Sequence, residues 1–238
     1  MSKSRTEIKG LCFDKDGTLF DFSATWESWA ADFLRRASKG DLLRAAQAGH
    51  AVGFDFETRS FSKDSIVIAG TVSEIVAVLA PHFPEYSPDE LLELVNEEAG
   101  IAPQEPVVPL VPLMSSFRAA GIALGVATND SETPARAHLD SVGVTQLFDF
   151  IAGYDSGYGG KPETGQLVAF ANAVGLPSHQ IAMVGDSRHD LVAGRAAGMW
   201  TVAVLTGVAD AEELAPFADV VLKNIGEIPE WLNSISCS

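Results

Sequence analysis

Two aspartates near the start of the chain have the residue type and spacing that chemistry would need. Asp14 and Asp16 directly follow an apolar segment, residues 8–13, which predicts a buried strand. Alternate residues of a strand point to the same side, so both carboxylates are expected to face one site, with Lys15 turned aside. Gly17 lets the backbone bend away at once. Carboxylates this close repel each other, which indicates a shared proton or a cation bound between them.

A simpler interpretation of this stretch is an ordinary turn at a strand end, because Asp-Gly is a common turn dipeptide. A calcium-binding EF-hand loop is a second alternative, but its spacing does not fit. With Gly17 at the glycine position of such a loop, Cys12 and Ser23 would occupy the first and last ligand positions, where carboxylates are required. The stretch by itself leaves a turn and a catalytic site open.

The second half of the chain predicts the elements that would position these carboxylates. From residue 103 onward, short apolar strands alternate with helices that end at glycines. Strands are expected at residues 122–128, 151–153, 181–184, 201–205 and 220–222, and helices at 131–142, 162–174 and 189–197. This alternation predicts an α/β fold with a doubly wound parallel sheet covered on both faces. The first strand belongs to the same sheet, so residues 1–20 and 103–238 form the expected core domain.

Residues 21–102 predict an inserted, all-helical cap domain. Trp26 and Trp29 recur at helical spacing after a candidate N-cap, Ser23, and they are expected to be core residues or the underside of a lid. A second helix is expected at residues 41–51, followed by an unpatterned loop at 52–65. Two capping boxes then open further helices, at Thr71 with Glu74 and at Ser87 with Glu90.

Other polar residues follow the predicted strands and should meet Asp14 at the carboxyl edge of the sheet. They are Thr128, Asn129 and Asp130 after one strand, Asp186 and Asp190 after another, and Lys161 at the start of a helix. Taken singly, each is more commonly a helix N-cap or a solvated lysine. The run Gly159-Gly160-Lys161 is no phosphate loop, because Asp155 stands where the first glycine is needed and Pro162 follows the lysine.

Composition narrows the class of protein. The chain has 238 residues, 47% of them hydrophobic, and a formal charge of −16, which argues against nucleic acid or an anionic membrane as a partner. Residues 1–10 lack the apolar segment of a signal peptide, and no apolar run is long enough to span a membrane. With Cys12 in a buried strand and Cys237 in the tail, no disulfide is expected. We therefore expect a cytoplasmic protein, as a monomer or homodimer.

Taken together, these motifs resemble those of the haloacid dehalogenase-like (HAD) hydrolase superfamily. The segment Asp14-Lys15-Asp16-Gly17-Thr18 is followed by Thr128, Lys161 and Gly185-Asp186-Ser187 with Asp190, in the order that this superfamily shows. The helical insertion is similar to its type I cap, and among subfamilies the chain is most similar to phosphoglycolate phosphatase-like enzymes. The resemblance covers nearly the whole chain. It implies a phosphatase that acts on a small phosphorylated metabolite.

The resemblance also implies a mechanism. Asp14 would be the nucleophile that takes the phosphoryl group as an aspartyl-phosphate. Asp16 would protonate the leaving alcohol and then activate the hydrolytic water. Mg²⁺ would be the cofactor, held by the Asp14 carboxylate, the Asp16 backbone carbonyl and Asp186.

The remaining motif residues would bind phosphate or support those that do. The resemblance implies that Thr128, the Asn129 backbone and Lys161 hold the phosphoryl oxygens, with Lys161 as the third catalytic residue. Thr18 would be a helper at the phosphate site. Asp190 would orient Lys161 or metal-bound water.

Several alternatives stay open. A phosphomutase similar to β-phosphoglucomutase would share the nucleophile and the acid. A haloalkanoate dehalogenase is disfavoured because it needs neither metal nor Asp16. A phosphonatase would need a Schiff-base lysine, for which Lys63 is the candidate, although a solvated lysine is the simpler interpretation. A non-catalytic binding module on the same fold is the alternative outside enzymes.

The expected cap loop suggests a substrate. Arg59 and Lys63 lie in the unpatterned stretch at residues 52–65, which would descend over the active site. A guanidinium pairs bidentately with a carboxylate. We therefore expect Arg59 to bind the carboxylate of a small phosphorylated acid such as 2-phosphoglycolate.

Overall fold

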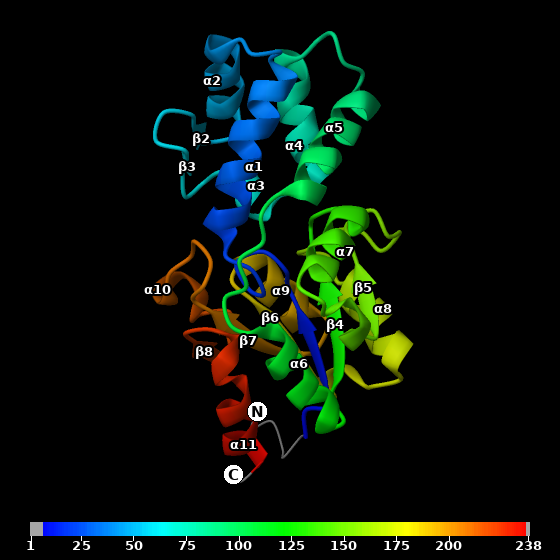
Figure 1. Ribbon diagram of the computed structural model, residues 1–238. Helices are drawn as coiled ribbons and strands as arrows, with labels where there is room; N and C mark the ends of the chain where they lie inside the picture. The colour runs from blue at the N-terminus through cyan, green and yellow to red at the C-terminus, as the bar shows by residue number, and fades with distance from the viewer. Residues whose placement is uncertain (1–6, 237–238) are drawn as a thin grey trace.

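A six-stranded parallel sheet forms the centre of the molecule (Figure 1). The computed structural model describes residues 7–236, so Cys237 and most of the amino-terminal segment discussed above lie outside the described residues. The sheet order is β5-β4-β1-β6-β7-β8, and every neighbouring pair is parallel. The strands are β1 (Gly10–Phe13), β4 (Ala123–Ala127), β5 (Phe150–Ala152), β6 (Ile181–Gly185), β7 (Trp200–Val204) and β8 (Val220–Leu222).

Helices cover both faces of this sheet because side chains alternate along each strand. In β1, Leu11 and Phe13 join one apolar cluster with helices α6 (Leu110–Ala119) and α11 (Ile228–Ser236). Cys12, between them, joins a second cluster with α8 (Gly165–Val174) and α9 (Arg188–Ala196) on the opposite face. The remaining core helices are α7 (Glu132–Ser141) and α10 (Ala211–Leu214), with short 3₁₀ turns at Thr145–Leu147, Ser178–Gln180 and Ile225–Glu227. The predicted doubly wound α/β fold is confirmed.

The inserted residues lie beyond the carboxyl edge of the sheet (Figure 1). They form α1 (Phe22–Ala37), α2 (Leu42–Ala51), α3 (Ile66–Ala69), α4 (Val72–Leu79), a 3₁₀ turn (Ala80–His82) and α5 (Pro88–Ile101). These helices enclose an apolar cluster of their own, built around Trp29, Phe33 and Leu91. The two connections run side by side, since Asp21 N donates to Glu105 O at 2.8 Å and Val107 N to Leu19 O at 3.1 Å. The chain therefore leaves the sheet and returns to it at one place.

The insertion was predicted to be all-helical, but residues 52–65 contain a small hairpin. Strands β2 (Phe54–Asp55) and β3 (Ser60–Phe61) pair antiparallel within that stretch. Asp55 Oδ1 accepts from the backbone N–H groups of Glu57 and Thr58 and so closes the turn. The strands are too short for the alternation that signals a strand in a sequence.

Helix boundaries differ from the prediction in two places, while both predicted capping boxes form. Asp21, not Ser23, is the N-cap of α1, and its Oδ1 accepts from Ala24 N at 2.8 Å. Helix α8 begins at Gly165 rather than Pro162, which places Lys161 in the preceding loop. Helices α10 and α11 were not predicted. None of the described helices is long and apolar enough to cross a membrane.

Candidate active site

The end of β1 carries Asp14 into contact with a lysine from a distant loop. Lys161 Nζ lies 2.5 Å from Asp14 Oδ1 and 2.6 Å from Asp190 Oδ1. All three side chains are buried and line one cavity between the sheet edge and the cap. We call Asp14, Asp190 and Lys161 the Lys161 cluster. Asp190 also accepts from Ser187 N at 3.0 Å and Ser187 Oγ at 2.7 Å through its other oxygen, so the cap of α9 fixes the carboxylate that holds the lysine.

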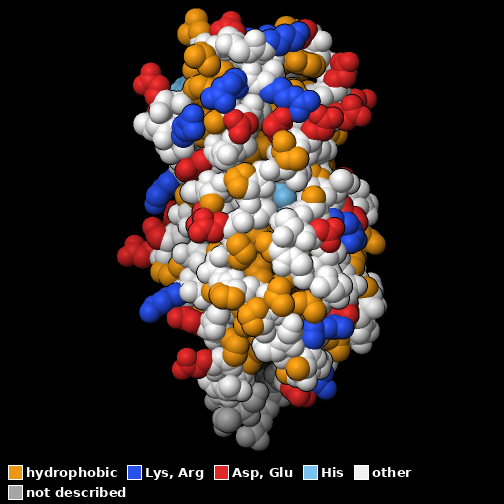
Figure 2. Space-filling model, in the orientation of Figure 1, with side chains coloured by type: hydrophobic (Ala, Val, Ile, Leu, Met, Phe, Trp, Pro, Cys, Tyr) orange, Lys and Arg blue, Asp and Glu red, His pale blue; other side chains and the backbone are white. Residues whose placement is uncertain are grey.

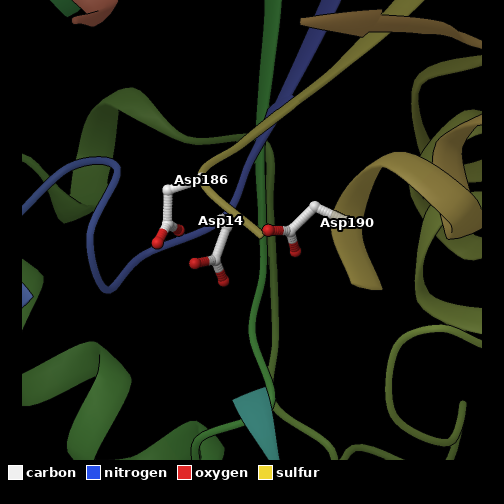
Figure 3. A group of neighbouring side chains, drawn as sticks. All are labelled: Asp14, Asp186 and Asp190. Carbon is white, nitrogen blue, oxygen red and sulfur yellow. The ribbon is translucent and has the colours of Figure 1, made fainter. Parts of the chain in front are cut away.

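A third carboxylate, Asp186, reaches the same point from the loop after β6. Oxygen atoms of Asp14, Asp186 and Asp190 lie within 4.8 Å of one another, and Figure 3 shows the three side chains converging. Thr18 Oγ1 donates to Asp186 Oδ1 at 3.2 Å. Two glycines leave room for Asp186: a Cβ at Gly17, where φ is +74°, or at Gly207 would lie within 2.4 Å of its Oδ2. The position of Asp186 therefore depends on segments far apart in the chain.

Burial and crowding make these carboxylates hard to ionise. Burial, together with repulsion from Asp190 and Asp16, raises the pKa of Asp14 to about 7, although Lys161 opposes the shift. Burial and the neighbouring Asp14 and Asp190 likewise raise the pKa of Asp186 well above its ordinary value. Burial alone would lower the pKa of Lys161, but Asp14 and Asp190 raise it above its usual range. When all three carboxylates are ionised, one lysine leaves two of their negative charges uncompensated.

This group of residues fits a divalent cation. Its donors are carboxylate oxygens, which Mg²⁺ prefers, and they already converge on one point. A cation there would relieve the repulsion that raises the pKa of Asp14 and Asp186. Of the predicted ligands, the structure brings Asp14 and Asp186 together. Asp16 was predicted to contribute only its backbone carbonyl to the cation, and its carboxylate contacts a different residue.

That carboxylate pairs with Lys15, which was expected to turn aside from the site. Lys15 is fully buried, and its Nζ lies 2.8 Å from Asp16 Oδ1 and 3.2 Å from Asp130 Oδ2. It also lies 2.8 Å from His138 Nδ1 on α7 and 5.4 Å from the centre of the Trp26 ring. Asp16 and Asp130 line the cavity, whereas Lys15 and His138 lie behind them. We call Lys15, Asp16, Asp130 and His138 the Lys15 cluster.

The contacts of His138 define its tautomer. A lysine ammonium only donates, so His138 Nδ1 must accept from Lys15, and Nε2–H then donates to Ala99 O of α5 at 2.6 Å. Burial and the adjacent Lys15 charge lower the pKa of His138 to about 4, so the imidazole is neutral near pH 7. Burial raises the pKa of Asp130 to about 6, against the attraction of Lys15. The cluster thus connects Asp16 to a cap helix.

The cap side of the cavity is apolar. It is lined by Phe22, Trp26, Val67, Ile68, Ala69, Gly70, Val72 and Ile75. Asn129 joins this wall to the core, because its Nδ2 donates to Ala69 O at 2.9 Å and to Lys161 O at 2.8 Å, while its Oδ1 accepts from Lys161 N at 2.7 Å. Trp26 is both buried and part of the wall, which combines the two roles expected of it.

The other predicted phosphate-binding residues are placed as follows. Thr128 lines the cavity, and its Oγ1 accepts from Asp130 N at 3.1 Å. The side chain of Asn129 is occupied by the three bonds above, which leaves only its backbone for the predicted role. Thr18 is fully buried and contacts Asp186, so it supports a carboxylate instead of facing the cavity.

The structure does not bring Arg59 to the site. Arg59 is exposed at the turn between β2 and β3, where its φ is 53°, and it does not line the cavity. Lys63 is also exposed, with its Nζ 3.8 Å from Asp210 Oδ2, and it borders a neighbouring hollow rather than the cavity at Asp14. Arg59 lies away from the site because residues 52–65, expected to form a loop over it, form a hairpin that folds back onto the cap and away from the sheet edge.

Sequence reasoning missed the roles of His138 and Gly207 and did not identify which residues Lys15 contacts. A charged residue between the two aspartates was visible, but its destination depends on α7, which lies more than a hundred residues later. His138 carried no signal except an unusual position on the apolar side of a helix. Gly207 follows the strand β7 in a Thr-Gly pair, and nothing in the sequence links it to Asp186.

Comparisons with known proteins agree with this arrangement. The sequence matches the haloacid dehalogenase-like hydrolase family over residues 8–198. It is 28% identical to a phosphoglycolate phosphatase of Rhodospirillum rubrum, over 94% of this chain and 90% of that protein. It is 26% identical to an N-acetylmuramic acid 6-phosphate phosphatase of Pseudomonas aeruginosa, over 98% of both proteins.

A solved structure shows the same fold. CbbY from Rhodobacter sphaeroides, in complex with phosphate, superposes with a TM-score of 0.70 at 21% identity, covering 93% of this chain and 96% of that one. The resemblance inferred from the motifs is confirmed by a family match that spans the insertion and strands β1, β4, β5 and β6 of the sheet. This chain belongs to the haloacid dehalogenase-like hydrolase family.

Proposed function

We propose that this protein is a magnesium-dependent phosphomonoester hydrolase that works through an aspartyl-phosphate on a small phosphorylated metabolite. One observation carries the proposal: Asp14, Asp186, Asp190 and Lys161 converge at one sheet edge, beside a cavity that Asp16 also lines. A nucleophile, an acid, a cation site and a fixed ammonium are the parts that phosphoryl transfer through an enzyme carboxylate needs.

The geometry suggests a division of labour between the aspartates. Asp14 Oδ1 is held by Lys161, so the other oxygen is the one left to attack phosphorus. Asp16 has one oxygen held by Lys15 and lines the cavity, which suits a group that protonates the leaving oxygen and later accepts a proton from water. Lys161 also lies where negative charge builds up on the phosphoryl oxygens. Thr128 and the Asn129 backbone would complete the phosphate site.

The cation has a defined place in this proposal. Mg²⁺ held by Asp14 and Asp186, with the Asp16 carbonyl, would supply positive charge that offsets repulsion between the nucleophile and an anionic phosphate. Asp190 would keep Lys161 in place. We also propose the domain division predicted above, with residues 1–20 and 103–238 as the catalytic core and 21–102 as the cap.

Relatives support the substrate class. Several proteins similar to this chain are named as phosphatases of small acids or sugars, among them phosphoglycolate phosphatases. We therefore propose a small phosphorylated metabolite as the substrate, with 2-phosphoglycolate as one candidate. The predicted carboxylate partner, Arg59, does not support that candidate, because it is exposed away from the cavity.

The test is metal-dependent hydrolysis of a general substrate. The purified protein is treated with EDTA and assayed with p-nitrophenyl phosphate after addition of Mg²⁺ or Ca²⁺. We expect EDTA to abolish turnover, Mg²⁺ to restore it, and Ca²⁺ not to, because its looser coordination disfavours in-line geometry. Full activity in EDTA would contradict the proposal.

The same assay separates a hydrolase from a phosphomutase. A hydrolase releases inorganic phosphate in equal amount with the alcohol, whereas a mutase transfers the phosphoryl group to a second hydroxyl. The amounts of inorganic phosphate and of p-nitrophenol released are therefore both measured, in the presence and in the absence of an added hexose phosphate. A requirement for the hexose phosphate would favour the mutase.

A further inference from the structure

We infer that the alcohol released by this site is uncharged, and that a phosphorylated acid such as 2-phosphoglycolate is a poor substrate. The inference rests on the proposed phosphatase function and concerns the part of the substrate that faces the cap. It depends on three observations: the chemistry of the cap wall, the charge balance of the cavity, and the positions of the cap's basic residues.

The cap wall presents hydrocarbon to the substrate. Phe22, Trp26, Val72 and Ile75 are buried against the cavity, and Ile68 lies half-buried beside them. Such a surface favours an apolar group and leaves a carboxylate without partners for its lone pairs. The indole nitrogen of the wall, Trp26 Nε1, is buried with no hydrogen-bond partner among residues 7–236. An indole N–H can meet one hydroxyl or ether oxygen, but it carries no charge to offset an anion.

The cavity already holds an excess of negative charge. Five carboxylates line it (Asp14, Asp16, Asp130, Asp186 and Asp190). The two nearby lysines are both committed, Lys161 to Asp14 and Asp190, and Lys15 to Asp16 and Asp130. With all five carboxylates ionised, the two lysines and a bound divalent cation would still leave one negative charge in excess before the phosphate enters. A second anionic group on the substrate would therefore meet repulsion in a site of low dielectric.

Arg59, Lys63 and Arg188 do not line the cavity. Arg59 is exposed on the hairpin, Lys63 lies against Asp210 in the neighbouring hollow, and Arg188 stacks on Phe217 with its guanidinium 4.6 Å from the ring centre. On the face seen in Figure 2, many of the cap's Lys and Arg side chains lie on its outer surface among Asp and Glu. His189 is the one further basic side chain along the cavity within the described chain, and the charge of Glu74 lies close to it.

The experiment compares two substrates of nearly the same shape with the Mg²⁺-loaded enzyme. Isobutyl phosphate replaces the carboxylate of 2-phosphoglycolate with an isopropyl group, so the two differ mainly in charge. We expect kcat/KM to be at least about 10-fold higher for isobutyl phosphate, the scale on which an apolar pocket discriminates. p-Nitrophenyl phosphate is assayed in parallel as a measure of phosphatase activity itself.

Two variants at the wall locate the effect. Ile68→Lys places a cation on the cap side of the cavity and should shift the ratio of the two kcat/KM values toward the acid by about 10-fold or more. Ile68→Met, the matched control, adds no charge and should not shift it. Arg59→Ala, outside the cavity, should also leave the ratio unchanged. Circular dichroism and thermal melting establish that each variant is folded, and the wild-type ratio alone tests the inference if Ile68→Lys is not.

The outcomes separate the two proposals. Turnover of p-nitrophenyl phosphate together with equal or faster turnover of 2-phosphoglycolate than of isobutyl phosphate would overturn this inference and leave the phosphatase proposal intact. A selective loss of 2-phosphoglycolate turnover in Arg59→Ala would also overturn it. No turnover of any of the three substrates would overturn the proposed function and the inference with it.

Discussion

The Lys161 cluster and the Lys15 cluster have similar parts and different surroundings. In each, one buried lysine lies between two aspartates, with Nζ to oxygen distances of 2.5 and 2.6 Å around Lys161 and 2.8 and 3.2 Å around Lys15. Lys161 itself lines the cavity, and Asp186 adds a third carboxylate there. Lys15 lies behind the cavity wall, where the neutral His138 adds a contact to cap helix α5.

The difference shows how one ion pair can serve chemistry and another can serve position. Around Lys161, charge is left unbalanced, so a cation and an anionic substrate have something to bind. Around Lys15, the lysine and His138 make their polar contacts within the protein and do not line the cavity, so they hold Asp16 in place while Asp16 itself faces the cavity.

The largest effect is expected at Asp14 of the Lys161 cluster and Asp16 of the Lys15 cluster, the proposed nucleophile and the proposed acid. Asp14→Asn removes the nucleophile and should lower turnover by at least about 10⁴-fold, with no phospho-enzyme. Asp16→Asn leaves the nucleophile intact and should cost about 10²-fold or more. With p-nitrophenyl phosphate, whose leaving group needs no proton, rapid-quench labelling should trap more phospho-enzyme in Asp16→Asn than in the wild type. Equal labelling of the two variants would contradict the assigned roles.

Replacing each lysine with methionine should separate the clusters by their response to metal. Either change leaves two carboxylates, at least one of them buried, without their cation and should lower the free energy of unfolding by about 3 to 5 kcal/mol in EDTA. Chemical denaturation should then show that Mg²⁺ recovers part of the loss in Lys161→Met, because the cation site adjoins the same carboxylates. No such recovery is expected in Lys15→Met. Recovery in both variants would mean that the Lys15 cluster also reaches the cation site.

The neutral state of His138 should appear as a pH dependence of stability. Its pKa is about 4 in the folded protein and about 6.5 when unfolded, so as pH falls the unfolded state takes up the proton first. The neutral His138 therefore stabilises the fold fully at pH values above its unfolded-state pKa, and this stabilisation is lost as pH falls toward its folded-state pKa. Between about pH 7 and about pH 5, the wild type should lose about 2 kcal/mol relative to His138→Gln.

Denaturation of the wild type and of His138→Gln at both pH values measures that difference. Glutamine can accept from Lys15 and donate to Ala99 without titrating, so other groups cancel in the comparison. A difference that does not change with pH would show that His138 is not held neutral by its surroundings.

The smallest effect is expected at Thr18. Its hydroxyl donates to Asp186 Oδ1, so Thr18→Val should raise the Mg²⁺ concentration for half-maximal activity by about 10-fold, the lower end of what partners of metal ligands contribute. Turnover at saturating Mg²⁺ should change much less. Thr18→Ser keeps the hydroxyl and should restore the wild-type Mg²⁺ requirement. An unchanged requirement in Thr18→Val would show that this hydrogen bond does not affect the cation site.

Much of the catalytic edge could be predicted from the sequence by itself. Strand-ending aspartates, a threonine after the next strand and helix starts rich in Asp and Ser are local patterns, and the parallel topology that local alternation predicts brings strand ends to one edge. The convergence of Asp14, Asp186, Asp190 and Lys161 was therefore foreseeable. The capping boxes of α4 and α5 were equally local, since each involves residues three apart.

The positions of Lys15 and Arg59 depend on how distant segments of the chain pack. A long side chain between two aspartates has several carboxylates within reach, and the packing of α7 and α5 selected Asp16, Asp130 and His138 for Lys15. Arg59 depended on a hairpin whose two-residue strands carry no periodic signal. Short-range patterns determine strand ends and helix caps because their partners are near in sequence. The neighbours of a flexible cation come from distant segments, so its position is defined only when those segments pack.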